Sequence, residues 1–292
     1  NAKHLLEQGL STIVPLAVIR YQQQFQGQDM GAVISLSSSL EPYRLTEIQY
    51  GAVTRIGVDA DKDAYCLRIQ DSLAIKGDLF TEEVGLQVIK PLCLQLGKLI
   101  HDFSVAGLYR YSPEWSNLEY NFDRKQIVLT DLDSTLSLAQ LPEDLQRLHV
   151  LRDLASLLYR TMAKFSTPNA LAHYSLTNLL KYDPIYDLLL GYFPLAKEQE
   201  LQLIARRLWH AFIPYLFTLK KHRNQILESW DNERRRSYKM DHDLFYLLAI
   251  MSVYPVFCCS DLAHLYPSQL TQTDLLTRAQ RYLGERYEYF SY

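Results

Sequence analysis

The chain has 292 residues, of which 48% are hydrophobic and 22% are charged, and its 30 Lys and Arg residues nearly balance its 33 Asp and Glu residues, for a net charge of −3. This is the composition of an ordinary folded protein, and it excludes a disordered, collagen-like or strongly charged chain. The near-neutral balance does not favour a polyanionic partner, and basic and aromatic residues do not alternate along any expected strand, so we expect no nucleic acid partner.

The cysteines and the apolar segments indicate the setting of the chain. Its four cysteines form no CxxC pair and are too few for a disulfide scaffold, so we expect free thiols, with Cys258 and Cys259 buried, and a cytoplasmic location. The longest apolar stretch, residues 244–257, has 14 residues and contains a proline. A membrane-spanning helix needs about 20 apolar residues, so this stretch predicts a buried helix and no membrane span.

The first expected elements in chain order are a short helix over residues 2–8 and a β-hairpin. Residues 13–21 and 30–36 are rich in β-branched side chains, and residues 26–29 form the turn between them. An isolated hairpin is only marginally stable. We therefore expect this hairpin to pack on another element or to belong to a larger sheet.

Beyond the hairpin, residues 53–58 and 65–69 are candidate strands in a stretch with a mixed pattern. From Thr81 onward, apolar residues recur at intervals of three and four, which predicts one long helix that ends before Gly107. Pro91 lies inside this pattern and is expected to kink the helix or to divide it.

A second hairpin and a helical body complete the expected architecture. Short apolar runs at 118–120 and 127–130 flank the turn residues 121–125, which predicts the hairpin. Almost every later apolar pattern has the helical period, which predicts an α+β protein with a small β-containing front and a large helical body. The expected helices of the body cover residues 146–165, 171–181, 198–216, 244–251 and 272–283.

The most informative residues lie around the second hairpin. Asn117 precedes its first strand, Asp131 follows its second strand 14 positions later, and Asp133 comes two residues after that. An amide oxygen and a carboxylate brought together at neighbouring strand ends form a hard oxygen site that is suited to Mg²⁺ and its phosphates. The alternative is a strand that ends in a polar turn, with Asp133 capping the element that follows.

This arrangement resembles the kinase-like phosphotransferases, in particular the aminoglycoside and choline kinase branch. In that family a long helix leads to a catalytic loop, and the last asparagine of the loop and the aspartate after the next hairpin hold magnesium. The resemblance implies that Asn117 and Asp131 bind ATP and Mg²⁺, and that Asp133 also binds Mg²⁺. It implies a protein-kinase-like α+β fold with a remnant small β lobe, residues 1–41, and a large, mainly helical C-terminal lobe that carries the catalytic-loop-like hairpin, residues 42–292.

The resemblance extends to both sides of this segment. Residues 96–101, followed by Gly107, resemble the helix end that precedes the family's catalytic loop. Residues 13–36 resemble the last two strands of its small lobe. Downstream, residues 152–158 resemble the helix that carries a structural aspartate behind the active site, which implies that role for Asp153.

Other positions depart from the family's pattern. Ser112 stands where the catalytic aspartate is expected, and Arg110 stands at the histidine-like position before it. The usual base is therefore absent. Because phosphoryl transfer depends mostly on positioning and electrostatics, its loss need not abolish the reaction, and Glu114 is a candidate substitute. No glycine-rich phosphate loop and no strand lysine precede residue 13, so these residues leave the affinity for ATP open.

Two functions follow from the resemblance. The first is an ATP- and magnesium-dependent phosphotransferase, or a descendant of one, that acts on a small hydroxylated molecule or a peptide held by the helical body. The second is a catalytically inactive kinase-like module that binds or scaffolds a protein partner, such as another modifying enzyme, and Ser112 is the residue that favours it. A helical interaction protein with an accidental resemblance is the third alternative.

Three further clusters of charged residues have ordinary structural interpretations. His101 and Asp102 are neighbours on a helix and point about 100° apart, which indicates a helix-end histidine rather than a catalytic pair. Residues 241–243 (DHD) precede an apolar pattern, which is typical of helix caps. The third cluster is basic and consists of Arg234, Arg235 and Arg236. We expect it on a solvated helix face or at a docking site for an acidic peptide or phosphorylated ligand.

Overall fold

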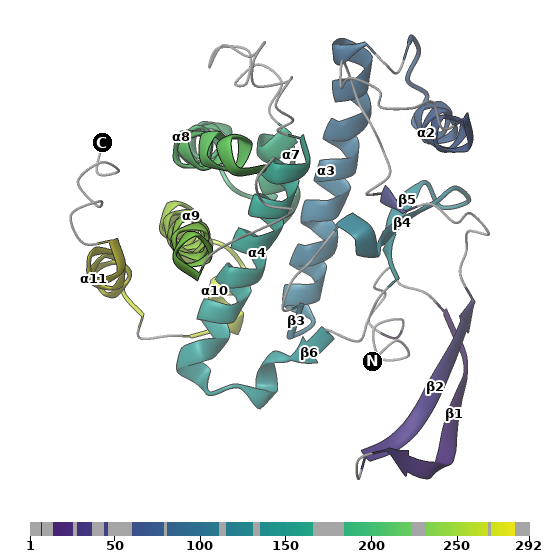
Figure 1. Cartoon of the computed structure of the whole chain (residues 1–292), viewed down its shortest axis with the longest axis horizontal. Helices are drawn as coiled ribbons and strands as arrows, with labels where there is room; N and C mark the ends of the chain where they lie inside the picture. Colours follow the sequence, from purple (N-terminus) through teal and green to yellow (C-terminus); the bar gives the residue numbers. More distant parts are fainter. Residues whose placement is uncertain are drawn as a thin grey trace.

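The described part of the chain is an α+β protein that is mostly helical, with three two-stranded antiparallel sheets (Figure 1). The expectation of an α+β protein is confirmed, whereas its relation to the kinase fold stays a prediction, as does the division at residue 41. Of the helix expected at the N-terminus, only Glu7 is described, and it is helical. This computed structural model describes residues 7, 14–25, 28–36, 44–45, 60–78, 81–110, 115–130, 135–165, 184–223, 232–267 and 270–283.

The first predicted hairpin is confirmed. Strands β1 (Val14–Phe25) and β2 (Gln28–Leu36) pair antiparallel, with Val14 opposite Leu36 and Phe25 opposite Gln28. Both strands are longer at the turn end than the apolar pattern indicates, because the polar residues near the turn also pair. The candidate strand over 53–58 lies outside the described residues.

The candidate strand over 65–69 is wrong, because these residues belong to helix α2 (Ala60–Ser72). Tyr65, Cys66 and Ile69 are buried, whereas the two residues between Cys66 and Ile69 are exposed. This spacing is helical, since a half-buried strand would bury every second residue. A run of five residues is too short for the sequence pattern alone to distinguish the two periods.

The long helix is confirmed as α3 (Glu82–Val105), which is continuous through Pro91. The Thr81 hydroxyl caps its first turn by accepting the Val84 N–H at 3.4 Å. Gly107, just beyond its end, has a φ of +71°, a conformation that favours glycine. The long helix and its stop are therefore both local properties of this sequence.

Two small sheets follow α3. Strands β4 (Leu118–Asn121) and β5 (Gln126–Leu129) form the second predicted hairpin. Strand β3 (Leu108–Arg110) pairs with β6 (Thr135–Ser137), which the sequence did not indicate. Because β6 follows the hairpin, this pairing returns the chain to the end of α3.

Of the five helices predicted for the body, three are confirmed, one is longer than predicted and one lies outside the described residues. The helices over 146–165, 198–216 and 272–283 are confirmed, and the one over 171–181 lies outside the described residues. The helix expected over 244–251 is much longer, so residues 241–243 lie inside it and their interpretation as caps is wrong. The body consists of α4 (Glu143–Phe165), α7 (Pro184–Tyr192), α8 (Glu198–Arg223), α9 (Asn232–Cys258), α10 (Leu262–Leu265) and α11 (Gln272–Leu283).

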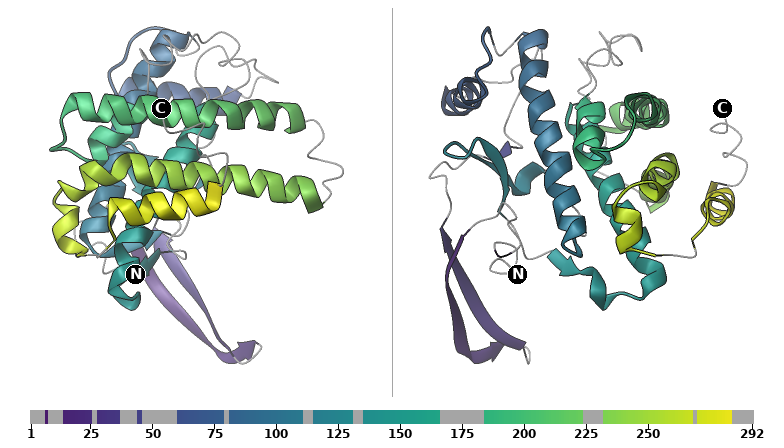
Figure 2. Two further views of the ribbon diagram at one scale, coloured as in Figure 1. Left: turned by 90° about the vertical axis from the view of Figure 1, so that its left-hand side faces the viewer. Right: turned by 180° about the vertical axis from the view of Figure 1, so that it is seen from behind.

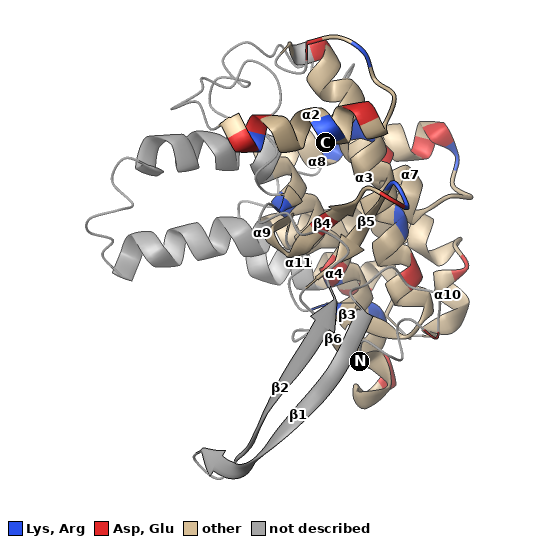
Figure 3. Cartoon of the chain, turned by 90° about the vertical axis from the view of Figure 1, so that its right-hand side faces the viewer, with Lys and Arg blue, Asp and Glu red and all other residues tan. Residues whose placement is uncertain are grey.

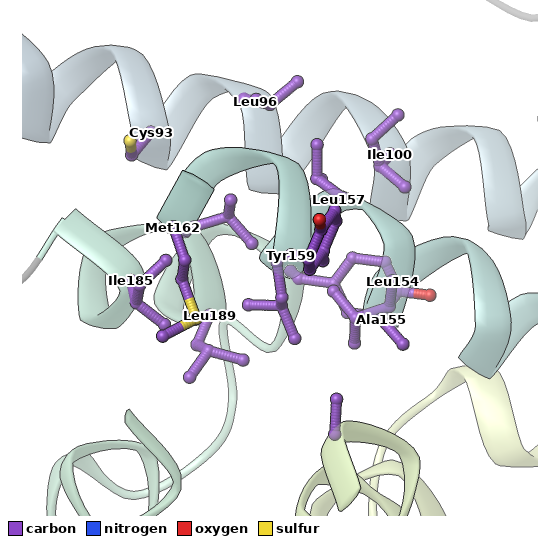
Figure 4. Close-up of a cluster of buried hydrophobic side chains, with 14 of the residues drawn as sticks. Cys93, Leu96, Ile100, Leu154, Ala155, Leu157, Tyr159, Met162, Ile185 and Leu189 are labelled. Carbon is purple, nitrogen blue, oxygen red and sulfur yellow. The ribbon is translucent and has the colours of Figure 1, made fainter. Parts of the chain in front are cut away.

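Helix α4 lies at the centre of this body, between α3 and the pair α8 and α9, with α11 outside α9 (Figures 1 and 2). Figure 4 shows apolar side chains of α3, α4 and α7 meeting in one buried cluster. Leu96, Leu154 and Leu189 each come from a different one of these helices and are fully buried. Burying such a side chain contributes about 1.5–3 kcal/mol, so this cluster fixes α4 firmly in the fold.

The exposure of the cysteines corrects one prediction. Cys258 and Cys259 are exposed, so the expectation that they are buried is wrong, whereas Cys66 and Cys93 are buried free thiols. Cys258 and Cys259 follow the buried Phe257 at the end of α9, where the chain turns away from the core. Each helix in the described part of the chain is too short or too polar to cross a membrane.

Candidate functional site

The site begins with a buried carboxylate on α4. Asp153 is only 5% exposed, and its Oδ2 accepts the backbone N–H of Arg110 at the end of β3. Burial raises the pKa of Asp153 well above its usual value, while the hydrogen bond from Arg110 and the charges of Arg152 and Arg110 act in the opposite direction. Asp153 therefore ties the chain beyond α3 to the central helix.

Local structure explains why Arg110 reaches α4. Gly107 ends the α3 segment, and its carbonyl oxygen accepts the N–H of Leu138 at 2.8 Å. Between these points β3 pairs with β6, with Arg110 opposite Thr135. Arg110 is 1% exposed, so the whole residue lies in the interior beside α4.

A second contact with α4 lies at Trp115. This residue begins the short 3₁₀ helix η2 (Trp115–Asn117), and its indole Nε1 donates a hydrogen bond to Thr161 Oγ1 at 3.1 Å. Both side chains are buried. Asp153 and Thr161 are eight positions apart on one helix, so α4 holds Arg110 and Trp115 at points about 12 Å apart along its axis.

Asn117 lies at the end of η2, beside the end of strand β5. Its backbone oxygen accepts both the N–H and the hydroxyl of Thr130, each at 3.0 Å. Asn117 is half-buried, so it does not lie in a dry core. Asp131 is the next residue along the chain after Thr130, so it directly follows the residue that bonds to Asn117.

The other predicted catalytic and metal-binding residues lie outside the described residues: Ser112, Glu114, Asp131 and Asp133. Their roles, and the meeting of the Asn117 and Asp131 side chains, therefore stay predictions. Within the described residues, no group of three or more His, Cys, Asp or Glu side chains is placed to hold a metal ion. The magnesium hypothesis consequently depends on oxygens from both ends of the second hairpin.

Side chains from two helices hold this hairpin in place, and the sequence pattern indicated neither contact. Gln95 of α3 donates to the backbone oxygen of Lys125 at 3.2 Å and accepts the N–H of Ile127 at 3.0 Å. The hydroxyls of Ser72 and Tyr120 lie 3.1 Å apart and connect α2 to β4. Hydrogen bonds over such sequence separations leave no local periodicity, so no local signal was available to find them.

A buried glutamate of β4 was also missed. Glu119 is 2% exposed and forms an ion pair with Arg44, which precedes the helical body. A buried carboxylate requires a partner, because an unpaired buried charge is costly. Glu119 lies between Leu118 and Tyr120, and such an alternation on a strand is typical of a side chain that faces solvent, so the sequence pattern gave no signal of its burial.

His101 and Asp102 do meet, so the expectation that these helix neighbours point apart is wrong. His101 Nδ1 lies 3.2 Å from Asp102 Oδ1, and its Nε2 lies 3.2 Å from Asp261 Oδ2. The side chains bend toward each other across the helix surface. Because Asp261 directly precedes α10, His101 connects the end of α3 to that corner of the body, which is a structural role.

The predicted partner-binding residues lie within α9, although their side chains are outside the described part. The backbone of Arg234, Arg235 and Arg236 is helical, and both interpretations of this cluster, a solvated helix face and a docking site, stay predictions. On the described helices and strands visible in Figure 3, basic and acidic residues are interspersed.

Comparison of the chain with protein-family models, with curated proteins and with solved structures finds no match. The kinase interpretation therefore depends on the residues quoted above and on the contacts made by Asp153 and Asn117.

Proposed function

We propose that this chain is a kinase-like, ATP- and magnesium-dependent phosphotransferase, or a descendant of one, that acts on a small hydroxylated molecule or a peptide. The observation that carries the proposal is the hydrogen bond from the Arg110 N–H to Asp153. The resemblance assigns Asp153 to the helix behind the catalytic loop and Arg110 to the start of that loop. A buried contact between these two positions supports the assignment of both.

The second supporting observation concerns the ligands of the metal. Asn117 and Thr130 are joined at the backbone, so the chain after β5 starts beside Asn117. An amide oxygen of Asn117 with carboxylates of Asp131 and Asp133 is a donor set that fits Mg²⁺, which prefers hard oxygen ligands. When bound, Mg²⁺ neutralises the charge of the phosphates during transfer.

The proposed reaction transfers the γ-phosphoryl group of ATP to a hydroxyl oxygen of the acceptor and leaves ADP. In this scheme the hydroxyl proton passes to the Glu114 carboxylate, since Ser112 is too weak a base at neutral pH. The role of α4 is to hold the residues that flank this segment, because positioning supplies much of the rate enhancement in phosphoryl transfer.

Thermal unfolding with and without MgATP tests the proposal. A ligand bound only by the folded state raises the melting temperature, so saturating MgATP is expected to stabilise the wild-type protein. Asp131→Ala and Asn117→Ala should each remove the shift. Asp123→Ala is the matched control, because it removes an exposed carboxylate from the turn of the same hairpin, and it should retain the shift. A wild-type protein that MgATP leaves unchanged contradicts the proposal, and a full shift in Asp131→Ala contradicts the metal assignment.

The absence of an aspartate at Ser112 favours a second function, a kinase-like module that binds nucleotide or a protein partner without phosphoryl transfer. Stabilisation by MgATP, together with no ATP consumption in the presence of hydroxylated small molecules or peptides, would indicate this function. If Arg234, Arg235 and Arg236 dock an acidic partner, reversing their charges should weaken a binding that decreases with salt. Binding that is independent of salt contradicts this role of the arginines.

A further inference from the structure

The hydrogen bond between Trp115 and Thr161 joins the turn before Asn117 to the central helix. The two residues are 46 positions apart, and the Nε1–Oγ1 distance is 3.1 Å. Trp115 is 3% exposed and Thr161 is fully buried. A buried indole N–H without an acceptor costs about 1–3 kcal/mol, so this pairing constrains both partners.

The geometry on the other side of Asn117 completes the constraint. Trp115 and Asn117 are the first and last residues of η2, whose three residues form a single 3₁₀ turn. The Trp115 side chain is held by Thr161, and the Asn117 backbone oxygen is held by the N–H and hydroxyl of Thr130. A turn of three residues held at both ends has little freedom to change its orientation.

Helix α4 is suited to act as the support for this turn. Its buried side pairs with α9 and α7, and its residues from Val150 to Leu158 include an almost continuous series of buried side chains. The same helix holds Arg110 through Asp153. If Trp115 lost its hydrogen bond to Thr161, η2 would therefore move relative to α4, while α4 and Arg110 would keep their positions.

We infer that Trp115 and Thr161 are positioning residues, whose buried hydrogen bond determines where Asn117 presents its side chain to a ligand. They act through Asn117 and need not touch substrate, metal or nucleotide. The importance of this position for MgATP binding rests on the proposed function. The constraint on Asn117 itself does not, because it follows from the two hydrogen bonds that flank this residue.

The N–H of Thr130 provides a direct reporter, because it donates to the Asn117 backbone oxygen. In Thr161→Val, which removes the acceptor and keeps the side-chain shape, we expect the Thr130 amide to exchange with solvent about tenfold faster, the factor that corresponds to the loss of about 1.4 kcal/mol of local stability. MgATP binding should weaken by a similar factor. Thr161→Ser retains the hydroxyl and should restore both properties.

Ser156→Ala is the matched control. Ser156 is a buried hydroxyl residue of the same helix, and its Oγ accepts the hydroxyl of Tyr246 from α9 at 3.0 Å. Its loss should lower the melting temperature about as much as Thr161→Val does. It should leave Thr130 exchange and MgATP affinity unchanged, because it does not involve η2.

The outcomes separate this inference from the proposed function. If Thr161→Val lowers stability but leaves Thr130 exchange equal to that of Ser156→Ala, the pair is merely structural and the inference is wrong. If wild-type protein does not respond to MgATP, the proposed function fails and the exchange measurement still decides the inference. Trp115→Phe removes the donor instead of the acceptor and gives the same test if Thr161→Val does not fold.

Discussion

The carboxylate of Asp153 accepts the backbone N–H of Arg110 from 43 positions earlier in the chain, and both residues are buried. A side chain that bonds to a backbone group fixes the path of the chain whatever the side chain at that position is. Here it fixes the residue at which β3 ends. The sheet of β3 and β6, which follows the end of α3, is thus joined to the central helix α4 by a single buried polar contact.

Asp153→Ala should therefore destabilise the protein by about 1–3 kcal/mol, because it leaves the buried backbone N–H of Arg110 without its acceptor. Urea unfolding at pH 7 measures the change. Asp144→Ala is the control on the same helix, where an exposed carboxylate in the first turn contributes at most about 1 kcal/mol. Equal losses in the two variants would show that the buried contact carries no special weight.

Gly97 and Gly191 allow α3 and α7 to touch through their backbones. A Cβ at Gly97 would overlap the carbonyl of Leu188 and lie 2.9 Å from the N of Tyr192, and a Cβ at Gly191 would meet α3 in the same way at Leu94. Alanine normally favours a helix by about 1 kcal/mol over glycine. At these positions the sign should reverse.

We expect Gly97→Ala and Gly191→Ala each to destabilise the protein by at least about 1–3 kcal/mol, through overpacking against backbone that cannot rotate away. The double variant should lose less than the sum, since one displacement of the helices relieves both overlaps. Chemical unfolding of the two single variants and the double variant measures the loss in the free energy of unfolding of each. A stabilised Gly97→Ala protein contradicts the close helix contact.

Asp187 should make stability depend on pH. Its side chain is 17% exposed, its Oδ2 is buried without a hydrogen bond, and the Lys90 Nζ lies 3.8 Å away. Burial raises its pKa from 3.8 to about 6, while Lys90 acts in the opposite direction. The folded state therefore binds this proton more tightly than the unfolded state does, so the contribution of Asp187 to stability decreases as the pH rises from about 4 to 6.

Asp187→Asn should consequently raise the melting temperature at pH 7.5. We expect the free energy of unfolding to increase by up to about 3 kcal/mol, and this increase should become smaller as the pH is lowered to 5. Thermal unfolding across this range measures the effect. Asp123→Asn, an exposed control, should show no such trend. A gain that does not vary between pH 5 and pH 7.5 would mean that Asp187 is not the group that titrates.

The four thiols should divide into two pairs by their rate of reaction with a thiol reagent. Cys258 and Cys259 are exposed and should react within the mixing time, whereas Cys66 and Cys93 are buried and should react only as the protein unfolds. Counting the released chromophore with and without denaturant measures both pairs. Four fast thiols in the native protein would contradict the packing of α2 and α3.

Local patterns in the sequence predicted the elements whose period is expressed over many residues. The apolar spacing of α3 and the turn residues of the second hairpin are examples, and the end of the helix at Gly107 follows from a single glycine conformation. Other elements lack such a pattern. Helix α7 is short and buried on most sides, so it has no polar face, and the first half of α9 is too rich in charged residues to show an apolar face.

The candidate site divides in the same way. The proximity of Asn117 to Thr130 follows from the hairpin, because pairing between nearby strands depends on a short turn. The resemblance to kinase-like proteins implied a structural role for Asp153, but it did not indicate that Asp153 would accept the N–H of Arg110. Nothing in the sequence indicated that Thr161 would meet Trp115.

By itself, then, the sequence determined an α+β chain with two hairpins, a long helix before the second hairpin and a helical body after it, because these features depend on residues a few positions apart. Only the tertiary structure decided that α4 lies at the centre and holds Arg110 and Trp115. Contacts between residues 43 and 46 positions apart depend on how whole helices pack, and a packed core leaves no periodic trace of which distant polar groups it brings together.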